Sequence, residues 1–264
     1  MNENDLRGLE DWFRVFADRY VHMSPEDRAV LELKIEHTWR VADNMSSLAA
    51  EGSLRWADPW LARAIGVLHD TGRFPQYHKH RTFSDSVSIN HGSLGATVLG
   101  ESGILDSLDA GDREILLSSL RYHNAFGLPS LDEERLMYLK LIRDADKLDI
   151  WRILVDCYVQ SGVECRDVVI QGIARSPGFS ADVVNWLGEG RMVPNSMLRN
   201  LNDMRLHHVS WAYDINYPAS CRMALEAGHL RRIASGLPDH PGVDEAVGRA
   251  LRMMERRAAH SGTD

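Results

Sequence analysis

The chain has 264 residues, of which 44% are hydrophobic, and a net charge of −8 at pH 7. A chain of this length can bury a hydrophobic core that needs no disulfide or structural metal to stabilise it. The negative charge excludes a broad basic surface, so we expect a small-molecule substrate and no nucleic-acid partner. No run approaches the ~18 consecutive apolar residues of a membrane span, and no apolar run follows the polar N-terminus, so we expect a cytoplasmic protein without a membrane partner.

Three helices are predicted before residue 73. Apolar residues at spacings of three and four predict an amphipathic helix over residues 5–20. Ser24 is placed to cap a second helix that runs to about Ala50, with proline at its first position and acids in its first turn. A third helix opens at Pro59 and ends near Gly72, after an apolar run.

The chain after residue 72 continues with one loop and further helices. Residues 73–90 carry many polar side chains with little helical periodicity and predict a long polar loop, which is more often functional than idle. With no run of alternating strand residues and no repeat, the predicted class is all-α. Periodic apolar residues predict the remaining helices over residues 91–99, 112–123, 131–155, 180–188, 195–212, 219–235 and 242–258.

The end of the third predicted helix is unusual, because an apolar run there meets two adjacent polar residues, His69 and Asp70. Burying a carboxylate is costly unless it is paired, protonated or bound to a metal. A second apolar helical stretch carries Asp144, Asp146 and Asp149 in its middle. Both stretches therefore need partners from elsewhere in the chain.

Histidines near the ends or inner faces of other predicted helices can supply those partners. His37 lies on the apolar side of the second helix, His91 opens the next helix after the loop, and His123 ends the following one. A helical bundle can bring such distant residues to one cavity. The three cysteines show no C-x-x-C spacing, so we expect reduced packing residues rather than a thiolate zinc site.

In this order the residues resemble the HD-domain superfamily of metal-dependent phosphohydrolases, whose pattern is a histidine, a His-Asp pair and a distant aspartate. The resemblance assigns the aspartate after the alanine of residues 144–149 as the last ligand, and the two flanking aspartates stay open as alternatives. The matching metal ligands are His37, His69, Asp70 and Asp146, with His91 and His123 in the places of the extra histidines of two-metal members.

The resemblance also implies an architecture. It covers about residues 25–155, which we expect to form an HD-domain-like helical bundle around the metal ligands. We expect a C-terminal helical extension over about residues 166–264, within a single all-α domain of residues 1–264.

The implied cofactor is a divalent transition metal, one or two ions. Imidazole and carboxylate ligands suit Mn, Fe, Co, Ni or Zn, with Mg a further option. Asp70 would bridge two ions, and Arg73 stands where two-metal relatives often have a lysine that meets substrate phosphate, so both are candidate catalytic residues. Arg73, Lys79, His80 and Arg81 are candidate substrate-binding residues, with a surface salt bridge for Arg73 and a solvated loop for the others as alternatives.

The leading functional hypothesis is hydrolysis of a phosphate ester of a small metabolite or nucleotide by metal-activated water. Mixed-valent di-iron oxygenases resemble this chain in the same six-ligand order and form the first alternative. A non-catalytic ligand-binding or signalling module is the second, disfavoured because such modules usually lose ligands. A small phosphorylated substrate is thus the expected partner, and the sequence leaves a homodimer open.

Overall fold

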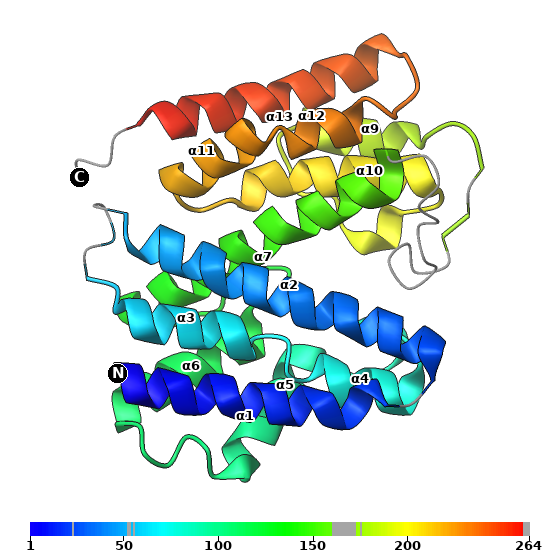
Figure 1. Ribbon diagram of the computed structural model, residues 1–264. Coiled ribbons are helices and arrows are strands. Elements are labelled where there is room, and N and C mark those ends of the chain that lie inside the picture. The colour runs from blue at the N-terminus through cyan, green and yellow to red at the C-terminus, as the bar shows by residue number, and fades with distance from the viewer. Residues whose placement is uncertain (23, 52–53, 55, 160–172, 175, 261–264) are drawn as a thin grey trace. The chain divides into compact units, whose positions relative to one another are not determined.

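The computed structural model describes residues 1–22, 24–51, 54, 56–159, 173–174 and 176–260 (Figure 1). These residues form helices and connecting segments with no strand, which confirms the all-α class. Within the same residues, no helix combines the length and the apolar character needed to cross a membrane.

The described chain divides into two compact units, Met1–Asp146 and Lys147–Asp264, and the helix Glu133–Val159 (α7) contributes to both. The expected single-domain organisation stays a prediction. Cys221 in the second unit is buried and free, whereas Cys157 is disulfide-bonded, contrary to the expectation that all cysteines are reduced.

The first unit follows the predicted helices closely up to residue 72. Ser24 Oγ accepts a hydrogen bond from the Asp27 amide at the start of α2, and Asp58 caps α3 in the same way. The helices of this unit before α7 are α1 (Glu3–Val21), α2 (Pro25–Ala49), α3 (Pro59–Leu68), α4 (Arg73–His80), α5 (His91–Ser102) and α6 (Ala110–Tyr122), with a short 3-10 helix η2 (Asp85–Val87) before α5.

The loop prediction for residues 73–90 was wrong in its first half, which forms α4. Phe74 and Tyr77 are buried at helical spacing, and the Phe74 ring packs edge-on against the Phe13 and Phe16 rings of α1 at centroid distances of 5.8 and 6.0 Å. Phe74 and Tyr77 are one apolar pair among polar residues, which is too few to show a helical period in the sequence.

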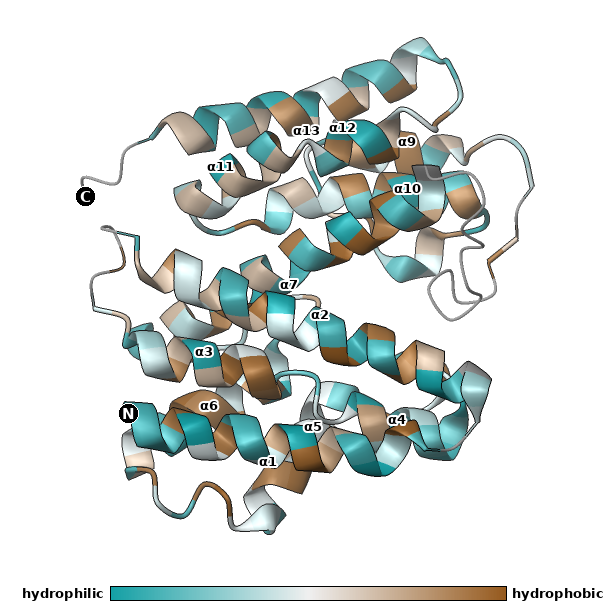
Figure 2. Cartoon of the chain, in the orientation of Figure 1, coloured by the Kyte–Doolittle hydropathy of each residue, from teal (hydrophilic) through white to brown (hydrophobic). Residues whose placement is uncertain are grey.

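The last five residues of α3, Ala64 to Leu68, are buried, and the end of this helix carries its most hydrophobic colours in Figure 2. Gly66 permits α3 to lie close to α2, because a Cβ atom there would come within 2.6 Å of the Ala42 Cα. The residues that follow α3 therefore begin inside the unit, beside α2, and not at its surface.

The second unit is also helical, but two of its predicted segments are interrupted. Gly228, with φ of 65°, ends one helix in the left-handed region that glycine favours, so residues 219–235 form two helices. The Trp151 side chain is fully buried and donates from Nε1 to the His208 carbonyl at 2.9 Å. Beyond α7 the elements are α9 (Ala181–Gly188), η3 (Asn195–Met197), α10 (Leu201–Ser210), η4 (Trp211–Asp214), α11 (Pro218–Ala227), α12 (His229–Ala234) and α13 (Pro241–Ala259).

Candidate metal centre

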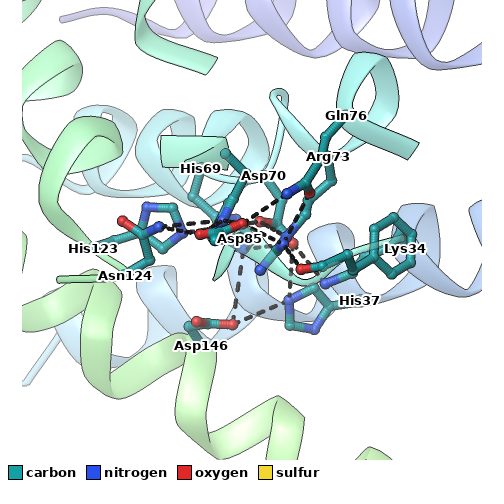
Figure 3. A network of polar contacts seen from close by, with 12 residues as sticks. Lys34, His37, His69, Asp70, Arg73, Gln76, Asp85, His123, Asn124 and Asp146 are labelled. Carbon is teal, nitrogen blue, oxygen red and sulfur yellow. Dashed lines mark hydrogen bonds and ion pairs between the residues drawn. The ribbon is translucent and has the colours of Figure 1, made fainter. Parts of the chain in front are cut away.

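Five helices of the first unit bring together the six metal ligands that the sequence predicts (Figure 3). The five helices hold them at a helix face, a helix end or the turn after a helix, and all six are buried except for partial exposure of the α7 aspartate. The six are His37 on α2, His69 and Asp70 after α3, His91 at the start of α5, His123 after α6 and Asp146 on α7.

Asp70 lies at the centre of this cluster, and its two oxygen atoms face different imidazoles. Oδ2 is 3.7 Å from His37 Nε2 and 3.6 Å from His69 Nε2. Oδ1 is 3.3 Å from His91 Nε2 and 3.9 Å from His123 Nε2. A carboxylate placed between two pairs of nitrogen donors has the arrangement of a bridging ligand in a two-ion site.

Each side of Asp70 has a further feature of a cation site. On the Oδ2 side, Asp146 Oδ1 lies 3.1 Å from His37 Nε2 and 3.9 Å from His69 Nε2, which adds a second carboxylate. On the Oδ1 side, the Nε2 atoms of His91 and His123 lie 3.0 Å apart. Two ring nitrogens that point into the same space suit one shared cation.

The outer nitrogens of three rings are held by the protein. His69 Nδ1 donates to the Gly66 carbonyl at 2.8 Å, and His123 Nδ1 donates to the Leu120 carbonyl at 2.7 Å, while His91 Nδ1 meets a carboxylate described below. A proton on Nδ1 leaves the Nε2 lone pair facing the cluster. Within the described part of the chain, the buried Nε2 of His69 makes no hydrogen bond, and a metal ion would satisfy it.

The HD domain family model matches residues 35–151, a segment that contains all six of these side chains. This segment is an HD domain. No curated protein and no solved structure matches the chain.

The protonation states of the candidate ligands in the HD domain suit cation binding. Burial lowers the pKa of His69, and it lowers those of His91 and His123 to about 4, so these rings are neutral at pH 7. Burial opposes ionisation of Asp70, but the nearby Lys34 charge, with smaller contributions from its other neighbours, outweighs it and holds the pKa of this carboxyl well below its usual range. Neutral imidazoles and ionised carboxylates bind a metal without first losing protons.

Close backbone packing positions the candidate ligands at the ends of α3 and α6 and the start of α5. A Cβ atom on Gly72 would collide with the His91 carbonyl oxygen, so only glycine lets the turn after Asp70 lie against the start of α5. Similarly, a Cβ atom on Gly92 would come within 2.6 Å of the Leu120 carbonyl oxygen at the end of α6. These approaches place His91 between the His-Asp turn and His123.

Asp85 is a residue of the centre that the sequence analysis missed. Its Oδ2 accepts from His91 Nδ1 at 2.7 Å and from Asn124 Nδ2 at 2.8 Å, while its Oδ1 accepts from Gln76 Nε2 at 2.8 Å. Burial opposes its ionisation, but the His91 hydrogen bond and nearby positive charges outweigh this effect and lower its pKa. Carboxylates that accept from the outer nitrogen of a metal-binding histidine orient that ring.

Lys34 is the second missed residue, and its Nζ lies 2.8 Å from Asp70 Oδ2. It precedes His37 by three positions on α2, and residues at this spacing share a helix face. That spacing was a usable signal, because it directs a lysine toward the same cluster as a predicted ligand.

The predicted substrate-binding residues separate into two groups. Arg73 lies at the centre, with Nε 3.4 Å from Asp70 Oδ1 and Nη1 3.1 Å from Asp85 Oδ1. Arg81 instead pairs with Asp27 at 2.9 Å. Lys79 is exposed and His80 partly so, and no described contact joins either to the six ligands, so their role in substrate binding stays a prediction.

Proposed function

We propose that this HD domain is a metal-dependent phosphohydrolase that cleaves a phosphate ester of a small metabolite or nucleotide. The observation that carries the proposal is the position of the Asp70 carboxylate. Its two oxygens face separate imidazole pairs, and Lys34 and Arg73 approach the same carboxylate. This combination joins a candidate two-ion site to cations that can hold phosphate.

The donor set fits one or two divalent ions. Imidazole nitrogens and carboxylate oxygens without thiolates suit Mn, Fe, Co, Ni or Zn. When bound, such ions acidify water for nucleophilic attack and offset negative charge on phosphoryl oxygens. The distances group His37, His69, Asp70 and Asp146 as the residues that would hold the first ion. Those that would hold the second are Asp70, His91 and His123.

The charges around the centre favour an anionic substrate once ions are bound. The three carboxylates of Asp70, Asp85 and Asp146 outnumber the two cations, Lys34 and Arg73, and the imidazoles of His69, His91 and His123 are neutral. Two divalent ions would reverse this balance to a clear positive excess. A phosphate ester supplies the matching negative charge.

Arg73 is oriented to bind that phosphate. Its Nη1 is held by Asp85, Gln76 and the Phe83 carbonyl, and Nε faces Asp70. Among the described contacts none uses Nη2, so this group can donate to a phosphoryl oxygen while the rest of the guanidinium stays fixed. Asp70 serves the chemistry as the central ligand.

The test is phosphate release from a panel of phosphate monoesters, diesters and nucleotides by the purified protein supplied with Mn²⁺. We expect release that chelation abolishes and that Arg73→Ala weakens about tenfold or more, since a charged hydrogen bond contributes roughly 1.5–3 kcal/mol. Metal content should be unchanged in that variant. Inert phosphate esters together with iron-dependent oxygen consumption would replace this proposal with the oxygenase hypothesis.

A further inference from the structure

Beside the metal centre, two cations share one aromatic ring. The Nζ of Lys34 lies 5.4 Å from the centroid of the Phe83 ring, and the Cζ of Arg73 lies 5.8 Å from it. The two cations also contact different oxygens of Asp70: Lys34 Nζ lies near Oδ2 and Arg73 Nε lies near Oδ1. They come from different helices, α2 and α4, so the fold and not local sequence pairs them.

These cations lie where solvent reaches the centre. The side chains of Lys34 and Arg73 are 18% and 16% exposed to solvent, whereas the four imidazoles are at most 3% exposed. Figure 3 shows Lys34 and Arg73 on the side of Asp70 away from His123. A substrate that enters from solvent on this side would therefore meet the cations before the four imidazoles, whereas Asp146 is itself 19% exposed.

Lys34 retains hydrogen-bonding capacity at this position. An ammonium group has three N–H donors, and the described contacts of Lys34 are one hydrogen bond to Asp70 and the face of the Phe83 ring. The ring face stabilises a nearby positive charge without using a donor. Lys34 is thus directed at the centre and can still donate to a ligand.

Building on the proposed hydrolase function, we propose that Lys34 and Arg73 form a two-cation clamp on the substrate phosphoryl group, and that this clamp selects phosphate monoesters over diesters. A monoester dianion presents three terminal oxygens, enough for the clamp and the ions together. A diester presents two such oxygens and one negative charge. Lys34 precedes the segment that matches the HD family model by one residue, so its assignment comes from the geometry of this chain.

The test compares anion binding by Mn²⁺-loaded full-length protein at pH 8, measured by calorimetric titration. Inorganic phosphate represents the monoester group and dimethyl phosphate the diester group. In Lys34→Met we expect phosphate to bind about tenfold more weakly or worse, because one charged hydrogen bond is lost, and dimethyl phosphate to lose less than about threefold. The manganese content of Lys34→Met should stay unchanged. Lys34→Arg, which keeps the positive charge, should keep most of the phosphate affinity. Lys34→Gln provides a second neutral variant.

Arg28→Met is the matched control, since it removes one positive charge from the exposed face of the same helix, where Arg28 pairs only with Glu32 among the described ion pairs. It should bind both anions as the wild type does. Wild-type phosphate affinity in both neutral Lys34 variants would overturn the clamp and leave the hydrolase proposal standing. Altered manganese affinity without altered phosphate affinity would make Lys34 only a counter-charge for Asp70. A wild-type protein that neither binds phosphate nor hydrolyses esters would overturn both proposals.

Discussion

Buried histidines occur in both compact units, but their ring nitrogens meet different partners. In the first unit, His69 donates from Nδ1 to a carbonyl and directs Nε2 at Asp70. In the second, His207 Nδ1 lies 2.6 Å from the Val193 carbonyl oxygen, and its Nε2 accepts from Trp211 Nε1 at 3.1 Å. The protein itself therefore satisfies both nitrogens of His207.

This difference separates a candidate ligand from a packing residue. Burial lowers the pKa of His207 to about 4, as it does for His91 and His123, so burial and neutrality do not distinguish the two regions. The distinguishing features are a nitrogen without a protein hydrogen bond and a carboxylate facing it. Among the described residues, groups that could hold a metal ion occur only around Asp70.

The largest expected effect comes from removing the central carboxylate. Asp70→Ala should lose most of the bound metal and all phosphate release, because both candidate ion sites use Asp70. Elemental analysis of the purified protein measures this, with about one to two ions per chain expected for the wild type. As a control from the second unit, His207→Gln should keep the full metal content. Full retention in Asp70→Ala would contradict the assignment of the centre.

A more selective change tests whether the centre holds two ions. His123→Ala should lose about one ion per chain, because the Asp70 oxygen that His123 approaches is Oδ1, on the side of the second candidate ion. Circular dichroism should show an unchanged helical content. Unchanged metal stoichiometry would instead indicate a mononuclear site formed by the residues on the Oδ2 side.

The packing histidine His207 should make the free energy of unfolding depend on pH. Because the pKa of His207 is about 4 in the folded chain and ~6.5 when unfolded, the unfolded state binds the proton more readily. Its contribution to stability should be complete above pH ~6.5 and decline as the pH falls toward 4, by roughly 3 kcal/mol in all. Denaturant unfolding of wild type and His207→Gln measures this, and the variant should show a flatter pH dependence. Parallel pH curves for the two proteins would show that His207 does not contribute.

The smallest expected effect concerns the residue that orients a candidate ligand. Asp85→Asn should weaken the second metal ion by roughly 10–100-fold, because it removes the carboxylate that holds the His91 ring. The first ion should bind normally, since the described contacts of Asp85 do not include His37 or His69. Competition titration with a metal indicator resolves the two affinities. An equal loss at both ions would mean that Asp85 maintains the whole centre.

Three of the six candidate ligands interrupt an apolar helical pattern, and the resemblance to the HD-domain superfamily supplied the complete set from sequence. His69 and Asp70 end a run that is buried on most sides, and Asp146 lies within another. Burying such groups is costly without partners, so polar residues at these positions indicate a site through sequence pattern alone. His207 also lies in a helix with buried residues, four positions after Asp203, so spacing alone does not separate it from a ligand. The structure does, because the Asp203 carboxylate accepts hydrogen bonds from Ser180 and from the Arg199 amide.

Asp85, and the pairing of Lys34 with Arg73, depended on tertiary structure. Asp85 lies in a short 3-10 helix without periodicity, and its four partners come from three other parts of the chain. Lys34 and Arg73 meet at Phe83 because α2 and α4 place them there. Sequence by itself determined the helical class, because apolar periodicity is a local property, and it predicted the candidate ligands through an order of motifs that resembles the HD-domain superfamily. Which side chains hold those ligands, and which cations approach Asp70, depends on contacts between distant segments, and only the packing of the helices decides those contacts.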